Sequence, residues 1–221
     1  MGYRTRILIP SVAFTLAYFA LTPAATAQTI GTELVVNGNF ETGDLTGWTN
    51  NGLNIVTPVN SGTNGLDDAS VIGGFVVTGS TGPTIQNAYQ DIDVSANASL
   101  IDAGNALASF AALLQSRRAG TSDTAIARLE MHSSSGSILG SLQFEDPANG
   151  QFDWELYEDT VGVASGTRTL RVVAESTRQG GGSSDSFIDN VSLTLVAVPA
   201  PGTLAVLAIS APLSVRRRRR G

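Results

Sequence analysis

Along residues 28–197, apolar and polar residues alternate in a series of short runs. TAIARLEM (124–131) places its alanines, leucine and methionine on one side and its arginine and glutamate on the other. TLRVVAE (169–175) alternates in a similar way. Successive side chains of a β-strand point to opposite faces, so each run predicts a strand with one buried face. Turn-forming sequences such as DPANG (146–150) separate the runs, which together predict an all-β fold, an antiparallel β-sandwich.

Three more runs extend this pattern. SILGSLQF (137–144) and SFIDNVSLTLV (186–196) alternate like the first two. NALASFAALLQS (105–116) is compatible with a helix or a buried strand, and we predict a strand because its neighbours need a partner. The chain contains no cysteine, so neither a disulfide nor a thiolate metal site can support the fold. A stretch of this length is expected to form one domain, over residues 28–197.

The N-terminal segment has the three parts of a secretory signal peptide. Arg4 and Arg6 precede the apolar run ILIPSVAFTLAYFAL (7–21), and ATA (25–27) offers small residues at alternate positions before Gln28. The apolar run is shorter than the ~20 residues that span a bilayer, which favours a cleaved signal over a membrane anchor. We therefore predict that residues 1–27 are a signal peptide and that the protein is exported through the inner membrane.

The C-terminal segment, residues 198–221, combines prolines, an apolar stretch and five consecutive arginines. As a helix, residues 203–215 would span ~20 Å at 1.5 Å per residue, against a hydrocarbon core of ~30 Å. Pro212 weakens such a helix further. Arginines beside an apolar segment stay on the cytoplasmic side of a membrane. The segment predicts a marginal membrane span whose C-terminus lies in the cytoplasm.

This arrangement at the end of the chain resembles the PEP-CTERM sorting signal of Gram-negative bacteria. The resemblance implies that an exosortase-type membrane protease or transpeptidase recognises the motif and removes the tail after the export machinery has delivered the protein. Ala200 stands where the usual signal has glutamate. The protein would be anchored transiently by its tail and would then reach the cell envelope or the extracellular space. The predicted sorting residues are Pro199, Pro201, Gly202, Arg216, Arg217, Arg218, Arg219 and Arg220.

The predicted domain is strongly acidic once the two end segments are set aside. Residues 28–198 hold six arginines and all nineteen acidic residues, a formal balance of −13. An acidic surface repels phosphate backbones, which excludes nucleic acid as a partner. The same surface can attract divalent cations.

The two ends of the domain resemble those of galactose-binding-like jelly rolls, a group that includes several carbohydrate-binding module families. The resemblance rests on NGNFETGDLTGW (37–48) and FIDNVSL (187–193). YQDIDV (89–94) and LIDAG (100–104) also fit secreted envelope proteins that carry this kind of tail. A jelly roll hosts sugar binding, adhesion and purely structural roles, so the resemblance implies the fold more than the function.

Asp189 is the strongest candidate for a metal ligand. The alternation of the last run, extended backwards from Val191, places Asp189 on the inward face, where a carboxylate is costly unless it is paired or coordinated. Ca²⁺ binds six to eight oxygens, and related jelly rolls supply a second ligand at the position of Glu41. Asp67 and Asp68 are further candidates. A second interpretation stays open, in which Asp189 caps a turn through backbone N–H groups.

Aromatic side chains are the usual platforms for sugar rings. Trp48 is expected in the core, where it closes the first turn. Trp154, with Tyr157 nearby, is the candidate ligand-binding platform, although the favoured interpretation of Trp154 is a tryptophan packed at an edge strand.

The sequence gives weaker evidence for catalytic residues than for ligand-binding residues. His132 is the only histidine, and the serines that follow it are adjacent in sequence, which does not establish the geometry of a Ser–His–Asp triad. No pair among the nineteen acidic residues stands out as the two carboxylates of a glycosidase. We expect a noncatalytic protein of the cell envelope or extracellular matrix, whose sandwich serves adhesion or structure. The alternative is a carbohydrate-binding module that recognises exopolysaccharide through its loops or its concave face.

The end segments predict the composition of the mature protein. Because ATA precedes Gln28 and the Pro-x-Pro motif precedes the arginine cluster, the mature protein should lack both ends. Intact mass spectrometry of the native protein measures this directly. A final extracellular product that retains Arg216 to Arg220 would contradict the sorting hypothesis.

Overall fold

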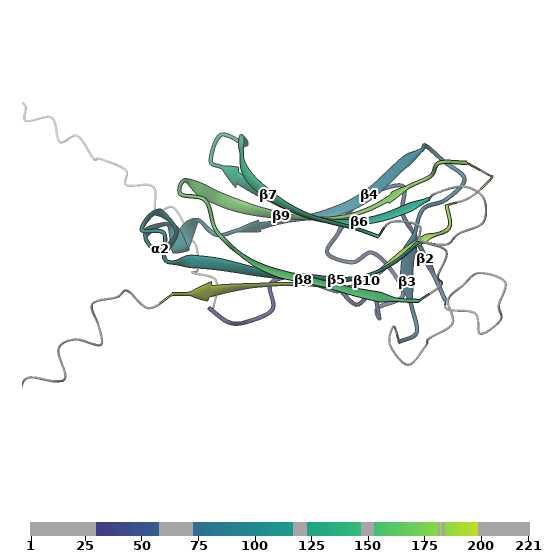
Figure 1. Cartoon of the computed structure of the whole chain (residues 1–221), viewed down its shortest axis with the longest axis horizontal. Helices are drawn as coiled ribbons and strands as arrows, with labels where there is room; N and C mark the ends of the chain where they lie inside the picture. The colour runs from purple at the N-terminus through teal and green to yellow at the C-terminus, as the bar shows by residue number, and fades with distance from the viewer. Residues whose placement is uncertain are drawn as a thin grey trace, which may run out of the picture.

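The computed structural model describes residues 30–57, 73–116, 123–146, 153–180, 182 and 184–198. In this part of the chain two five-stranded sheets stack face to face, and the short helix α2 lies at one end (Figure 1). The elements are β1 (Thr49–Asn51), β2 (Asn54–Val56), β3 (Val76–Thr78), β4 (Ile85–Asp93), η1 (Ser95–Asn97), α2 (Ala98–Asp102), β5 (Ala106–Ser116), β6 (Thr124–Ser133), β7 (Ile138–Asp146), β8 (Glu155–Gly162), β9 (Thr167–Thr177) and β10 (Ser186–Ala197).

The chain crosses repeatedly between the two sheets. The first sheet has the order β1-β4-β9-β6-β7 and the second has the order β2-β3-β10-β5-β8. All pairings between these strands are antiparallel. This arrangement confirms the predicted antiparallel sandwich of the jelly-roll class, and β5 confirms the predicted strand over residues 105–116.

The alternating runs form the inner faces of the sheets, as predicted. In β9, Leu170, Val172 and Ala174 are fully buried and belong to the main core. Arg171, between the first two, points the other way, because successive side chains of a strand alternate. In Figure 1 the first sheet bends toward the second in the middle of the molecule, so that its outer face is concave.

The loop before β1 packs against β10 and closes one side of the sandwich. Trp48 is buried, as predicted, with its ring centroid 5.5 Å from that of Phe40. Its indole N–H donates to the carbonyl of Asn37 at 3.2 Å. A Cβ atom on Gly38 would lie 1.9 Å from the carbonyl oxygen of Val191, so this close approach of two backbones requires glycine. The two ends of the domain are therefore neighbours in the fold.

The inward position predicted for Asp189 is wrong, because β10 contains a β-bulge. The register of β10 against β5 shifts between Asp189 and Ser192, and Asn190 adopts a left-handed φ of 47°. A bulge adds one residue to a strand and reverses the faces on its far side. The alternation that runs through Val191 therefore cannot be extended back to Asp189.

The residues before the bulge show the reversal. Ile188 pairs with Leu114, and both lie in the main core. Asp189 pairs with Leu113, which belongs to a small cluster with Phe187 and Val76. Asp189 and Phe187 thus lie on the outer side of the second sheet. Asp189 is nevertheless fully buried, so the predicted burial of its carboxylate is confirmed.

Candidate functional site

Charged and amide side chains cover the outer side of four strands in the first sheet. The strand register places Tyr89, Val173 and Arg128 in one row across β4, β9 and β6, and it places Asp91, Arg171 and Glu130 in the next. These rows lie on the concave side of the sheet. We call the following residues the polar face: Asn87, Tyr89, Asp91, Arg128, Glu130, His132, Gln143, Arg171 and Glu175.

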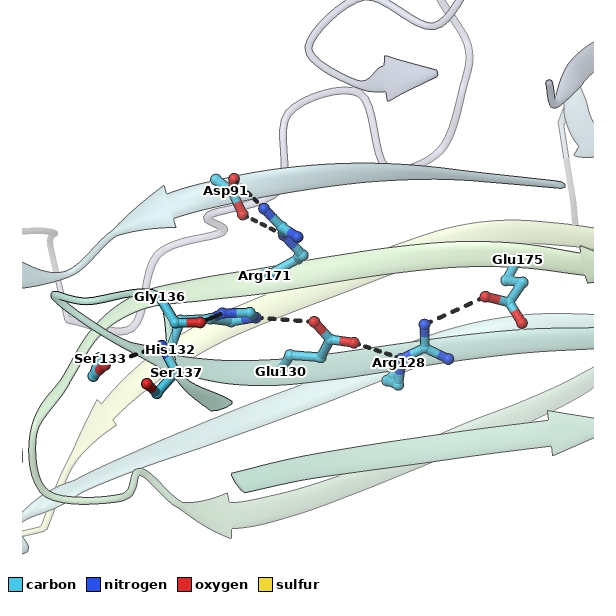
Figure 2. Close-up of polar contacts among 9 residues, drawn as sticks. All are labelled: Asp91, Arg128, Glu130, His132, Ser133, Gly136, Ser137, Arg171 and Glu175. Carbon is cyan, nitrogen blue, oxygen red and sulfur yellow. Dashed lines mark hydrogen bonds and ion pairs between the residues drawn. The ribbon is translucent and has the colours of Figure 1, made fainter. Parts of the chain in front are cut away.

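Arg171 joins β9 to β4 at the centre of this face (Figure 2). Its Nε and Nη2 atoms donate to Oδ1 and Oδ2 of Asp91, both at 2.7 Å. The guanidinium carbon lies 4.2 Å from the centroid of the Tyr89 ring, within range of a cation–π contact. The hydrogen bonds from Arg171 lower the pKa of Asp91 despite its partial burial, so Asp91 is ionised at neutral pH.

Arg128 forms a second network beside the first (Figure 2). Its Nε donates to Oε1 of Glu130 at 2.8 Å, and its Nη2 reaches Oε2 of Glu175 at 3.3 Å. Its Nη1 donates to Oε1 of Gln143 at 3.2 Å. Burial raises the pKa of Glu130, but hydrogen bonds from His132 and Arg128 outweigh it and the net shift is downward. Each side chain of this network is therefore held by its neighbours.

His132 ends the network at the turn after β6. Its Nε2 lies 2.9 Å from Oε2 of Glu130, and its Nδ1 lies 3.2 Å from the carbonyl oxygen of Gly136. The hydroxyl of Ser133 accepts instead from the backbone N–H of Ser137. Both ring nitrogens are thus engaged away from the serine, and the triad geometry that the sequence left open is not formed by Ser133 and His132.

Two hollows follow the polar face and share Arg171. The smaller one, about 210 Å³, is lined by Asn87, Tyr89 and Arg128 among others. The larger one, about 510 Å³, extends past Asp91 and His132 toward the end of the strands. Together they offer a shallow, open and polar surface.

A hollow more capacious than either of these lies elsewhere, on the second sheet. It holds about 790 Å³ between β2, β3 and the loop before β10, and Ile55, Phe75 and Phe187 are among its lining residues. Its wall includes Thr57, which is the last described residue before 58–72. Among its described lining residues, Asp185 is the one charged side chain.

The carboxylates predicted to bind metal are partly brought together. Glu41 accepts hydrogen bonds at Oε1 from the backbone N–H groups of Gly74 and Phe75, at 2.9 and 3.1 Å. Asp189 accepts one at Oδ1 from the N–H of Asn190 at 2.7 Å, whereas its Oδ2 is buried without a hydrogen-bond partner. The cap that the sequence allowed is thus present, but it satisfies only one of the two carboxylate oxygens.

The electrostatics of Asp189 reflect this incomplete pairing. Burial raises its pKa to about 8, the N–H of Asn190 opposes the rise, and the charge of Glu41 adds to it. A buried carboxyl oxygen without a hydrogen-bond partner, beside a second carboxylate, is a donor set that suits a hard cation such as Ca²⁺. Over the described ranges, no three His, Cys, Asp or Glu side chains gather closely enough to hold a metal by themselves. Asp67 and Asp68 lie outside the described residues.

Trp154 and Tyr157 lie on opposite sides of the second sheet and do not form one platform. Trp154 packs against the outer cluster around Phe187, and its indole N–H is buried without a hydrogen-bond partner. Tyr157 packs against the main core between the sheets, with its ring centroid 5.9 Å from that of Phe144. Its hydroxyl donates toward Glu155 and Asp146, at 3.0 and 3.3 Å.

The sorting residues Pro199, Pro201, Gly202 and Arg216 to Arg220 fall outside the described residues. Within the described ranges, no helix combines the length and the apolar character needed to cross a membrane.

The polar face was not singled out by the sequence. The alternation placed Arg128, Glu130 and Arg171 on polar sides of their strands, which the structure confirms. Alternation within a strand does not determine which strands are neighbours in a sheet, so the pairing of Arg171 with Asp91 could not be predicted. A predicted β4–β9–β6 order would have been the signal needed to find it.

No protein-family model matches the sequence, and no curated protein matches it either. Several solved structures share its fold. The enzymatically active domain of tailspike protein 4 from bacteriophage CBA120 has a TM-score of 0.52 at 14% identity, over 74% of this chain and 21% of that one. This chain therefore spans about a fifth of the tailspike structure.

Two further solved structures are similar over nearly their whole length. A cyclase from Fischerella sp. TAU, solved with 4-(1H-indol-3-yl)butan-2-one, has a TM-score of 0.51 at 12% identity, over 77% of this chain and 100% of that one. The carbohydrate-binding module TmCBM61, solved with β-1,4-galactotriose, has a TM-score of 0.46 at 16% identity, over 76% and 99%. At these identities the likenesses concern the fold alone.

Proposed function

We propose that this chain is an exported, noncatalytic protein whose β-sandwich binds carbohydrate through the polar face. The observation that supports the proposal is the interlocked set of planar polar side chains on the concave side of the first sheet. Guanidinium, carboxylate, amide and phenol groups stand there within one shallow surface. Sugars present many hydroxyl groups that both donate and accept hydrogen bonds, so a surface of this kind matches their chemistry.

Preorganisation supports the same proposal. Arg171 is fixed by two hydrogen bonds to Asp91 and by the ring of Tyr89. Arg128 is fixed through three of its nitrogens. A side chain that is already ordered loses little rotamer freedom when a ligand binds, which favours affinity. A shallow, open polar surface also accommodates an extended polymer better than a small enclosed metabolite.

The ionisation of Asp91 and Glu130 on the polar face supports binding rather than hydrolysis at this surface. Glycoside hydrolysis uses one carboxyl group as a general acid, whose pKa is raised so that it carries a proton. The pKa values of Asp91 and Glu130 are instead lowered by their arginine and histidine partners. Both groups are therefore ionised at neutral pH and carry no proton to donate to a leaving sugar.

The end segments suggest where the domain acts. A signal peptide over 1–27 and a PEP-CTERM-like tail over 198–221 would route it through the export machinery and an exosortase-type membrane protein. The bound carbohydrate would then be an exopolysaccharide of the cell envelope or matrix. An adhesive or structural role for the domain follows from such binding, since a protein that holds matrix polysaccharide also organises it.

A structural calcium ion is the second part of the proposal. Glu41 and Asp189 would supply carboxylate oxygens, and the unpartnered Oδ2 of Asp189 is the feature that supports a cation there. The ion would satisfy this oxygen and would offset the repulsion between the two carboxylates. The ion would tie the loop before β1 to β10. It would therefore lie at the second sheet, whereas the polar face belongs to the first sheet.

The buried carboxyl group of Asp189 predicts how stability changes with pH when calcium is absent. With a chelator present, native Asp189 retains a proton up to a pKa of about 8, whereas the ordinary value is 3.8, so folded protein binds more protons than unfolded protein between these values. The free energy of unfolding should therefore fall as the pH rises through this window and level off above it. Each pKa unit corresponds to about 1.4 kcal/mol, so the loss should reach several kcal/mol.

Urea denaturation at a series of pH values measures the free energy of unfolding of the wild type and of Asp189→Asn. The variant should lack this part of the pH dependence. Above pH 8, calcium should restabilise the wild type, by about 2.7 kcal/mol at a hundredfold excess over Kd, and should leave Asp189→Asn unchanged. Equal responses of the two proteins to calcium would leave Asp189 as a backbone cap alone.

The carbohydrate proposal predicts where substitutions weaken binding. Tyr89→Ala removes the support of Arg171, and Arg128→Gln breaks the second network. Each should lower the affinity for a bound polysaccharide at least tenfold, which is about 1.4 kcal/mol. Affinity electrophoresis against a panel of polysaccharides measures the change, and circular dichroism checks that each variant is folded.

Glu158→Gln is the matched control, because Glu158 is exposed on β8 in the other sheet. It should bind like the wild type. Wild-type affinity in both polar-face variants, or a loss confined to Trp154→Ala, would place the binding surface elsewhere.

A further inference from the structure

We infer that the polar face selects uncharged polysaccharides and rejects those that carry uronate or sulfate groups. The inference rests on the proposed function and specifies its ligand class. The inference follows from the pairing of the arginines with carboxylates of the protein, because arginines are the groups to which a polyanion would bind.

Each nitrogen of Arg128 already donates to a side chain of the protein. Its Nε donates to Glu130 at 2.8 Å, its Nη2 to Glu175 at 3.3 Å and its Nη1 to Gln143 at 3.2 Å. The two carboxylates bracket the guanidinium from both sides along the sheet. To take over either of these ion pairs, an incoming carboxylate would have to displace a glutamate and leave it unpaired on a half-buried surface, where both glutamate side chains are less than 15% exposed.

Arg171 is neutralised by a single partner. Asp91 accepts from its Nε and Nη2 in the bidentate geometry that a free carboxylate or sulfate would otherwise adopt. One face of the guanidinium lies over Tyr89. The strongest anion-binding edge of Arg171 is therefore already occupied by the protein's own carboxylate.

Arg168, at the end of the larger hollow, is also paired with an acidic side chain. Its Nη1 and Nη2 donate to Oδ1 and Oδ2 of Asp102, at 3.1 and 2.7 Å. Each arginine that lines the two hollows is thus paired with an acidic side chain.

The charge balance acts in the same direction. The strand register turns five carboxylates outward on this sheet, and Asp102 beside Arg168 is a sixth. They stand against the guanidinium groups of Arg128, Arg168 and Arg171, a formal balance of −3 with histidine counted as neutral. A surface of this sign repels a polyanion before contact. The five carboxylates are those of Asp91, Asp93, Glu130, Glu145 and Glu175.

The test compares polysaccharides that share a backbone and differ in charge. Suitable pairs are hydroxyethyl- and carboxymethyl-cellulose, methyl-esterified and de-esterified polygalacturonan, and desulfated and sulfated galactan. In affinity electrophoresis, the full-length protein should be retarded by the neutral member of at least one pair and at least tenfold less by its anionic counterpart. Affinity for the neutral member should vary little with salt, because no charge is neutralised on binding.

Asp91→Asn separates arginine pairing from net charge. It frees the guanidinium of Arg171 and should improve binding of the anionic member relative to the neutral one at least fivefold. Glu158→Gln changes the net charge equally on the other sheet and should leave that ratio unchanged. Glu175→Gln, which frees one nitrogen of Arg128, provides a second variant should Asp91→Asn fold poorly.

The outcomes distinguish the two proposals. Binding to neutral and anionic members with equal affinity, or tighter binding of the anionic member at low salt, would overturn the charge selectivity and leave carbohydrate binding intact. An unchanged ratio in both Asp91→Asn and Glu175→Gln would also overturn it. Failure of the wild type to bind any member would contradict the proposed function itself.

Discussion

The register of β9 against β4 and β6 is the constraint on which the rest of the structure depends. One side of these three strands supplies alanine, valine and leucine to the core, and the other side supplies the polar face. Because side chains alternate along a strand, a shift of one residue would exchange the two sides. The same register that buries Val172 also places Arg171 beside Asp91. Core packing and the candidate binding surface are therefore specified together.

The two outer faces of the sandwich differ in character. The first sheet presents paired charges in an open, concave surface. The second sheet carries an apolar cluster around Phe187, together with the buried carboxylate of Asp189. A metal ion on the second sheet would stabilise the domain without taking part in ligand recognition. In the proposed function, this division would separate a stabilising face from a binding face.

The sequence predicted most of the strands and little of the site. Alternation identified the strands that became β6, β7, β9 and β10, because a half-buried strand imposes a period of two on its own residues. It failed at Asp189, because a bulge at Asn190 changes the faces without an evident mark in composition. It could not find the polar face, since Asp91 and Arg171 are 80 residues apart and meet only through strand pairing.

Backbone amide chemical shifts, followed by NMR while an oligosaccharide of a bound polysaccharide is added, test the binding face most directly. If the polar face binds carbohydrate, the largest changes should fall on β4, β6 and β9, around Tyr89, Arg128 and Arg171. Residues of β5, β8 and β10 should change little. Changes centred instead on the hollow of the second sheet, at Ile55, Phe75 and Phe187, would contradict the assignment of the binding surface to the polar face.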